Sequence, residues 1–511
     1  MTSAVTDDEL SFGTSRGRWV IAATVLGSGI ASLDATVVGI ALPTIGRSFG
    51  GGVGTLQWVV TGYALTLAAF LLLGGSLGDR LGRKRVFSIG IVWFALASVC
   101  CGLAPNAGIL IGARVLQGIG GALLTPASLA ILQASFRPED RSRAIGAWSG
   151  LGGVATAAGP LVGGYLIAAG SWRYVFFINV PVAIVVLLLT ARHVPESRDP
   201  TSAGRVDGAG AALAVLFLGG LTYGLIEGPG HGWTSPVVLA SLIVAALTGP
   251  AFLITEHRRA HPMLPLGVFR SLQFTGANAV TFVVYGALGG ALFLLPIELQ
   301  VVSKYSPLDS GLALLPITFI MLIFSARSGQ LAARIGPRLQ MSVGPVVVGA
   351  GLALLAGSTH NGTYLTHVLP AVALFGIGLA ITVAPLTSTA MSAAPAEHSG
   401  VASAVNNVVA RAAGLLAVAV LPLLAGITGG AALHPSHFAA GFRTAVIIAG
   451  ATAAAGGLLA VLTIRNPSHP HRTRSERNLR GYYCAVDGAP LQPACEGADD
   501  GVGSSGGEPP A

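Results

Sequence analysis

Gly75-Ser-Leu-Gly-Asp79-Arg80-Leu-Gly82-Arg83-Lys84-Arg85 is a short charged stretch set between two long apolar runs. The whole chain is 52% hydrophobic and only 10% charged, so this cluster of one acidic and four basic residues stands apart. Such a cluster is typical of a fixed turn at the cytoplasmic face of a membrane. A positive anchor would explain the basic residues but not Asp79 or the glycines. We therefore expect a gate, formed by Gly75, Asp79, Arg80, Gly82 and Arg83, to coexist with the anchor.

Apolar runs of about 20 residues recur along most of the chain, and each is long enough to cross a bilayer as a helix. The chain has 511 residues and 71 glycines, and its mean hydropathy is +0.73. These features predict an all-α polytopic membrane protein rather than a soluble one. The predicted spans are fourteen: 19–42, 56–77, 86–103, 109–132, 144–168, 175–190, 208–226, 237–255, 272–295, 311–331, 341–356, 365–391, 400–425 and 442–464.

The distribution of charge predicts the orientation of these spans. Most of the 29 Lys and Arg fall at the two ends of the chain and in the loops that follow even-numbered spans. The opposite side carries only Arg47, Arg173, Lys304 and Arg443. The bias places both termini in the cytoplasm and the protein in the cell membrane.

An internal repeat predicts how the spans are grouped. The charged stretch at Gly75 is echoed by Gly329-Gln-Leu-Ala-Ala333-Arg334-Ile-Gly336-Pro337-Arg338, which lacks the acid. Two related six-helix halves with two helices inserted between them fit this spacing, and paired halves are typical of transporters. The predicted parts are a loose cytoplasmic N-terminus (1–18), an N-terminal half (19–192), a linker with the two inserted helices (193–271), a C-terminal half (272–464) and a disordered cytoplasmic tail (465–511).

Asp34 lies inside the first predicted span and Arg114 inside the fourth. A carboxylate at that depth costs ~2.5 to 3.5 kcal/mol, so it is expected to face a cavity or a partner. At 1.5 Å per residue, Asp34 lies roughly 12 Å and Arg114 roughly 8 Å from the outer surface. These depths are compatible with a direct or a hydrated pairing. The pair could serve only to orient helices, but ionisable groups inside a membrane are functional by default.

Other candidate residues fall in later spans. The fifth span has a stripe of small residues that allows close helix packing, and Pro160 within it permits a bend. The stripe serves either packing alone or a seam that moves during transport. Arg411, inside the thirteenth span, is a candidate for contact with substrate or an acidic partner. Glu227 and Glu298 lie near outer helix ends, where solvation is cheap, and are candidate proton or cation sites.

Several function classes are excluded by composition and spacing. The net charge of +8 comes from short loops between apolar runs and not from one basic face, which argues against nucleic-acid binding. The four cysteines (Cys100, Cys101, Cys484 and Cys495) lack metal-ligand spacing. No catalytic triad, phosphate loop or metal motif is present in the sequence, so we expect no enzyme activity, no cofactor and no metal.

Five motifs in order resemble the major facilitator superfamily, and within it the fourteen-helix drug:proton antiporters of the quaternary-ammonium and multidrug efflux type. The resemblance extends to about Ile464. The charged turn resembles the loop between helices two and three, and Arg114-Val-Leu-Gln117-Gly118 resembles the helix-four motif. The remaining three motifs are the antiporter motif formed by Gly150, Gly159, Pro160, Gly163 and Gly164; Leu33-Asp34-Ala-Thr36 through Pro43 of helix one; and Trp172-Arg173 through Asn179-Val-Pro181 at the start of helix six. Gly39 departs from the family, which usually has asparagine there.

The resemblance implies a monomeric, proton-coupled exporter of lipophilic or cationic small molecules that works by alternating access and confers drug or antibiotic resistance. It implies that Asp34 carries the proton and that Arg114 tunes it. The alternatives are a dedicated exporter of one metabolite or antibiotic, an uptake symporter, which the Gly159-Pro160 motif disfavours, and a membrane receptor that transports nothing. The apolar residues of the spans do not identify the substrate.

Overall fold

The computed structural model describes residues 10–198, 207–259, 262–357, 363–393, 399–429 and 434–466, and the residue pairs 482–483 and 492–493. The chain divides into two compact units, Met1–Arg465 and Asn466–Ala511. In the second unit, β1 (Tyr482–Tyr483) pairs antiparallel with β2 (Gln492–Pro493). The disorder predicted for the rest of this tail concerns residues outside the described part.

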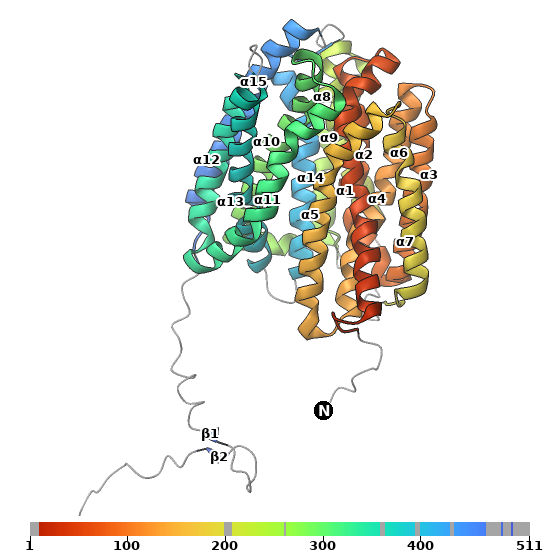
Figure 1. Ribbon diagram of the computed structural model, residues 1–511, viewed down its shortest axis with the longest axis vertical. Coiled ribbons are helices and arrows are strands. Elements are labelled where there is room, and N and C mark those ends of the chain that lie inside the picture. Colours follow the sequence, from red (N-terminus) through yellow and green to blue (C-terminus); the bar gives the residue numbers. More distant parts are fainter. Residues whose placement is uncertain are drawn as a thin grey trace, which may run out of the picture. The chain divides into compact units, whose positions relative to one another are not determined.

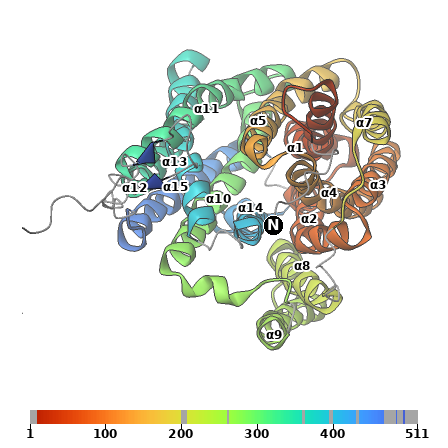
Figure 2. The same cartoon turned by 90° about the horizontal axis from the view of Figure 1, so that it is seen from below.

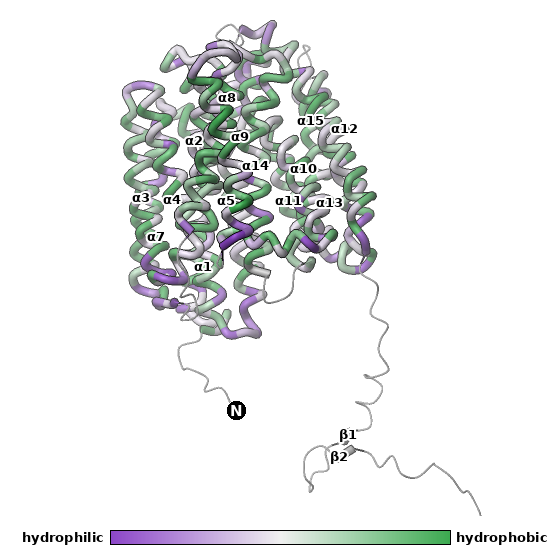
Figure 3. Tube along the Cα trace, turned by 180° about the vertical axis from the view of Figure 1, so that it is seen from behind, coloured by the Kyte–Doolittle hydropathy of each residue, from purple (hydrophilic) through white to green (hydrophobic). Residues whose placement is uncertain are grey.

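The first unit is built of helices, as predicted, and fourteen helical segments of its described part are long and apolar enough to cross a membrane. Hydrophobic positions follow the middle of the helices, and hydrophilic ones gather near their ends (Figure 3). In the N-terminal half and the inserted pair the helices are α1 (Ser15–Phe49), α2 (Val53–Leu81), α3 (Arg83–Leu103), α4 (Ala107–Ser135), α5 (Pro138–Ala168), α6 (Tyr174–Phe177), α7 (Asn179–His193), α8 (Gly208–His231) and α9 (Pro236–Arg258).

The C-terminal half repeats this plan. A 3-10 turn, η1 (Leu266–Arg270), leads into it, and π-helical turns end α10 and begin α13. The segments are α10 (Leu272–Ile297), η2 (Glu298–Val302), α11 (Pro307–Ile335), α12 (Pro337–Leu355), η3 (Tyr364–Val368), α13 (Leu369–Ser392), α14 (Ser399–Leu424) and α15 (Pro435–Thr463).

Two glycines mark the repeat in the backbone. Gly82 separates α2 from α3 with a φ of 111°, and Gly336 separates α11 from α12 with a φ of 85°. Positive φ angles of this kind favour glycine because it has no Cβ. The two turns that echo each other in sequence therefore share a backbone requirement.

Helix packing follows the repeat. In each half the first helix packs against the fifth, as α1 does on α5 and α10 on α14, and the second packs against the fourth, as α2 does on α4 and α11 on α13. The halves meet through reciprocal pairs, α5 with α11 and α2 with α14 (Figures 1 and 2). The inserted hairpin of α8 and α9 lies at the edge, where α8 contacts α2 and α14. We call the end of the bundle at which α1 begins the inner end, after the orientation that the charge bias predicts, and the opposite end the outer end.

Two details differ from the expectations. Residues 10–14 are not loose, because Leu10 donates a backbone hydrogen bond to the Ser135 carbonyl (2.8 Å) and Phe12 donates one to the Asp140 carboxylate (2.8 Å). The sixth span is divided between α6 and α7 at the single residue Ile178, which keeps helical dihedral angles (φ −60°, ψ −26°). Pro181 has no N–H to donate to the Phe177 carbonyl, so the sequence itself marks this interruption.

Candidate functional site

A polar network surrounds Asp34 in the middle of α1. Asp34 is fully buried, and Arg114 from α4 is 1% exposed. The Arg114 guanidinium forms an ion pair and a hydrogen bond with the Asp34 carboxylate. The structure therefore brings the two buried charges into direct contact, as the predicted depths allow.

Two amide side chains complete the carboxylate's surroundings. Gln117 Nε2 donates to Asp34 Oδ1 (2.8 Å), and Asn179 Nδ2 at the start of α7 donates to the same oxygen (3.0 Å). Both amides also donate to the Ser98 hydroxyl of α3. An ionised carboxylate only accepts hydrogen bonds, and all three groups facing Asp34 donate, so this arrangement matches the ionised form.

The guanidinium of Arg114 is held by further contacts in the same half. Its Nε donates to the Val59 carbonyl (3.0 Å), and its Nη1 donates to Gln117 Oε1 (2.6 Å). The Tyr63 ring lies 4.3 Å from the guanidinium carbon, and the Tyr63 hydroxyl donates to the Ala31 carbonyl (3.0 Å). Because these partners come from α1, α2, α3, α4 and α7, a change in the charge of Asp34 reaches most helices of the N-terminal half.

The antiporter-motif glycines form the contact between α5 and its neighbours at the outer end. A Cβ on Gly159 would strike the Thr36 side chain, and one on Gly163 would crowd the Val37 backbone, so these glycines allow α1 to approach closely. A Cβ on Gly164 would lie 2.7 Å from Leu308 Cα and from the Pro307 carbonyl oxygen of α11. Gly164 therefore lets the two halves touch backbone to backbone.

The same close approach is seen from the other half. A Cβ on Gly311 of α11 would strike the carbonyl of Pro160. Gly150 is not part of this contact, because a Cβ there would meet nothing within 4 Å. The stripe predicted along α5 is therefore tightly packed only in its outer part.

Hydrogen bonds between described residues of the two halves also lie toward the outer end. Gln57 of α2 donates to the Val418 carbonyl of α14 (2.8 Å), and Gln300 of η2 donates to the Ile40 carbonyl of α1 (2.9 Å). Together with the glycine contacts, these bonds close the outer end of the interface. We call this set of contacts the outer seam.

The charged turn makes its contacts within the N-terminal half. Asp79 pairs with Arg83 (2.8 Å), and Arg83 Nη1 donates to the Ala130 carbonyl of α4 (3.4 Å). The Glu196 carboxylate accepts from the Lys84 backbone (3.1 Å) and ties the turn to the segment after α7. Gly75 faces Pro126 of α4, and Arg80 is exposed. The gating role of Gly75, Asp79, Arg80, Gly82 and Arg83 stays a prediction.

The two outer glutamates differ from each other. Glu227 accepts from the Trp58 indole (2.7 Å) and pairs with His231 (3.0 Å), and it keeps a partly exposed side chain. Glu298 was expected to be solvated, but it is fully buried. It follows Ala291 and Leu294 on the buried face of α10, and Ser303 donates to one of its oxygens (2.9 Å).

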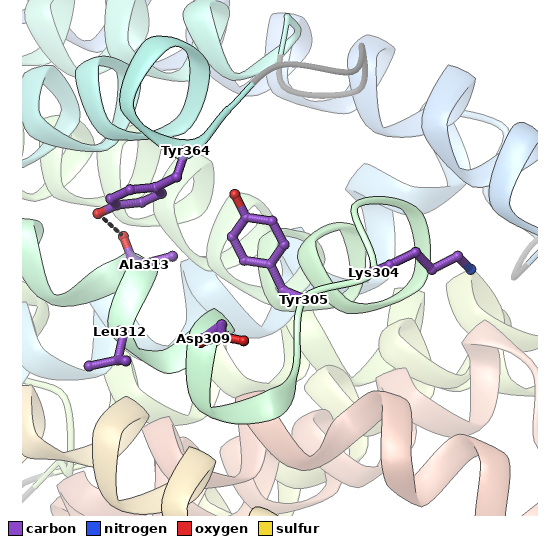
Figure 4. Close-up of a pocket in the computed structure, with 6 residues that line it drawn as sticks. All are labelled: Lys304, Tyr305, Asp309, Leu312, Ala313 and Tyr364. Atoms are coloured by element: carbon purple, nitrogen blue, oxygen red, sulfur yellow. Dashed lines mark hydrogen bonds between the residues drawn. The ribbon is translucent and has the colours of Figure 1, made fainter.

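A hollow of about 420 Å³ at the outer end of the C-terminal half is lined by Lys304, Tyr305, Asp309, Leu312, Ala313 and Tyr364. Figure 4 shows the rings of Tyr305 and Tyr364 across this hollow, with Asp309 below them and Lys304 directed away. The Tyr364 hydroxyl donates to the Ala313 carbonyl (3.4 Å). Burial, followed by the nearby charges of Glu298 and Asp309, raises the pKa of Tyr305. The sequence motifs do not predict this hollow, which is separate from the Asp34 network.

Gln117 and Asn179 are the network residues that sequence reasoning left without a role. Gln117 lies three positions after Arg114 and so on the same helix face, a signal that could have identified it. Asn179 was marked only as part of the motif at the start of helix six, and that motif assigned no role to it.

Comparison with known proteins agrees with this architecture. Residues 24–418 match the model of the Major Facilitator Superfamily. The chain is 39% identical over 384 residues to the multidrug resistance protein Stp of Mycobacterium tuberculosis, covering 75% of this chain and 71% of the relative. It is 34% identical over 450 residues to the methylenomycin A resistance protein of Streptomyces coelicolor, covering 88% of this chain and 92% of the relative.

Among solved structures, a bacterial homologue of the human lysosomal transporter Spinster, in an inward-facing conformation, matches with a TM-score of 0.64 at 17% identity. The match covers 89% of this chain and 100% of that one, and at this low identity it supports only a shared fold. The family match, the relatives and the fourteen membrane-spanning helices lead to one conclusion: this chain belongs to the Major Facilitator Superfamily and is a multi-pass membrane protein.

Proposed function

We propose that this protein exports drug-like lipophilic small molecules from the cell in exchange for protons. The observation that carries the proposal is the Asp34 carboxylate, buried within the membrane and held by Arg114, Gln117 and Asn179. Protonation of Asp34 would remove the negative charge that pairs with Arg114 and would place an O–H donor among groups that all donate. The network therefore has two different states, as a proton carrier requires.

Alternating access also requires that one end of the transporter be closed while the other is open, and the outer seam is the contact that closes the outer end in this conformation. Gly164 of the antiporter motif lies at one of its tightest contacts, while Gly159 and Gly163 pack the same helix against α1. Antiport requires that protonation and substrate binding disfavour each other. A proton crossing ~180 mV yields ~4 kcal/mol, enough for a gradient on the order of a thousandfold.

The proposal also covers the membrane location, the orientation and the oligomeric state of the protein. Charge bias supports insertion in the cytoplasmic membrane with both termini in the cytoplasm. We expect the protein to act as a monomer, without a cofactor and without enzymatic activity. The names of the relatives, among them a multidrug resistance protein, support export and not uptake.

The test is a toxicity panel in an efflux-deficient host that expresses either the intact protein or Asp34→Asn. We expect the intact protein to confer resistance that a protonophore abolishes, and the variant to confer none at equal expression. Resistance that survives in the variant would remove Asp34 from the coupling role, and accumulation of substrate in energised cells would indicate uptake instead.

A dedicated exporter of one antibiotic is the second candidate. A specific observation favours it, since a relative at 34% identity is named as a resistance protein for the single compound methylenomycin A. The breadth of the resistance panel separates the two candidates, because a dedicated exporter protects against one chemical class alone.

A further inference from the structure

The spans of this chain hold more positive charge than negative: Arg114 is buried, and Arg411 is half-buried with a buried Nε. Asp34 is the only acidic residue placed well inside a predicted span, whereas Arg114 and Arg411 are two basic residues there. Between Leu272 and Ile464 the acidic residues are Glu298, Asp309 and Glu397, which lie near the ends of the spans or in a loop. Apart from Asp34, therefore, no carboxylate lies well inside a predicted span where it could pair with Arg411.

Arg411 lies near the middle of α14, roughly 18 Å from the inner end of that helix. The α14 helix contacts α2, α8, α10 and α13 and occupies a central place in the bundle (Figure 2), so Arg411 does not reach its depth by facing lipid on a peripheral helix. Its Nε is buried without a hydrogen-bond partner, and no described carboxylate forms an ion pair with it.

The groups around Arg411 are polar but neutral. The hydroxyls of Tyr63 from α2 and Tyr285 from α10 lie within electrostatic range of its guanidinium. Tyr63 also lies against Arg114, with its ring centroid 4.3 Å from the guanidinium carbon, so Tyr63 is near both guanidinium groups. The carboxylate of Asp34 is already bound by Arg114, Gln117 and Asn179.

An arginine at this depth costs several kcal/mol unless it is paired or hydrated, so one whose Nε is buried without a partner and that pairs with no described carboxylate points to a function. A guanidinium binds a carboxylate through two parallel hydrogen bonds and remains charged at any physiological pH. The positive charge of Arg411 would, in contrast, repel a substrate cation.

We propose that Arg411 is the receptor for an acidic group, a carboxylate or its equivalent, on the exported molecule. The cargo would then lie between α2, α10 and α14, with its acid on Arg411 and its apolar body along the neighbouring helices. This inference rests on the proposed export function and names the chemical class of its substrate: lipophilic organic acids, in preference to lipophilic cations.

The test compares three fluorescent probes with the same apolar body: pyrenebutyrate, its methyl ester and a trimethylammonium analogue. Equilibrium binding to the purified full-length protein and proton-driven efflux from proteoliposomes are measured for wild type, Arg411→Gln and Arg411→Lys. A charge-assisted hydrogen bond is worth about 1.5 to 3 kcal/mol, so we expect Arg411→Gln to weaken binding of the acid relative to the ester by about tenfold or more. Arg411→Lys keeps the charge but loses the bidentate geometry, and we expect it to recover part of the preference.

The result that would overturn the inference is an equal change in acid and ester binding, or a wild-type protein that binds the cation as well as the acid. Thermal unfolding of each variant shows whether the fold is intact. The two measurements distinguish failure of the export proposal from failure of the proposal for Arg411. Acid binding that depends on Arg411, without efflux of any probe, would refute export but not the role of Arg411. Efflux of the ester without binding of the acid would refute the role of Arg411 but not export.

Discussion

The two halves of the bundle share one helical plan, yet their interiors differ in how buried charge is satisfied. In the N-terminal half, Asp34 and Arg114 neutralise each other within a network of amides and a hydroxyl. In the C-terminal half, Arg411 has neutral neighbours and an unpartnered Nε. Because a buried charge with all its partners needs no ligand, whereas one without them does, we assign the proton to the first half and the cargo to the second.

The largest effect is expected from Asp34→Asn, which abolishes the charge change on which the N-terminal half depends. The substitution is nearly isosteric, but it leaves Arg114 buried without its counterion. We expect proton-driven efflux to fall to background, at least a hundredfold, while substrate exchange without a proton gradient persists. Exchange is measured by counterflow in proteoliposomes, and equal loss of both activities would show that Asp34 is needed for substrate binding or folding and not specifically for coupling.

The dependence of transport on membrane potential tests whether the cargo bound in the C-terminal half leaves as an anion. If one proton enters for each acid anion that leaves, two charges cross the membrane per cycle, whereas exchange of a proton for a monovalent cation moves none. Each charge is worth roughly 2.3 kcal/mol per 100 mV, or about fiftyfold in the equilibrium gradient. Clamping the potential to zero with valinomycin at constant pH difference is therefore expected to reduce accumulation of pyrenebutyrate sharply. Insensitivity to the clamp would contradict export of the anion with one proton.

Gly164→Ala is expected to break the contact through which the halves meet at the outer end. Its Cβ would lie 2.7 Å from Leu308 Cα, so the backbones must separate. Overpacking of this kind costs about 1 to 3 kcal/mol, which shifts the population of the closed outer end about fivefold to a hundredfold.

The shift can be read from labelling of a Ser310→Cys reporter, which replaces a buried residue of α11, by an external membrane-impermeant maleimide. Gly146→Ala is the matched control, because a Cβ at that position of the same helix meets nothing within 4 Å. Equal labelling in both variants would show that α5 does not hold the outer end closed.

Gln300→Ala is expected to give a smaller shift toward the open outer end. Gln300 donates one hydrogen bond across the halves, and such a bond contributes about 0.5 to 1.5 kcal/mol, or roughly twofold to tenfold in the closed population. Gln340 is equally buried at 5% exposure, but it donates to Ser328 within its own half. Gln340→Ala should therefore lower the stability of the fold without raising maleimide labelling of the reporter.

The membrane class, the number of spans and the repeat of the two halves could be predicted from the sequence, because each depends on apolar length and glycine spacing. The depths of Asp34 and Arg114 were also predictable, since helical rise converts residue number into distance. The contact of Asn179 with Asp34 was not, because it depends on which helices pack together, as α7 does on α1, and helical rise does not determine that. The burial of Glu298 was missed because its position just after an apolar span suggested solvation, although it follows Ala291 and Leu294 on the buried face of α10.

The two repeated turns allow the finest comparison between the halves. Gly82 and Gly336 both have positive φ angles, so alanine at either position costs about 1 to 2 kcal/mol of backbone strain. At Gly82 the new Cβ would also lie 2.7 Å from the Glu196 carboxylate, which must move and release its hydrogen bond to Lys84. We expect Gly82→Ala to lower the free energy of unfolding by about 1 kcal/mol more than Gly336→Ala does. Adding Glu196→Ala to each variant should remove this excess, because the group that collides with the new Cβ is then gone. If the excess remains, the difference lies in the backbone of the turn and not in its contact with the segment after α7.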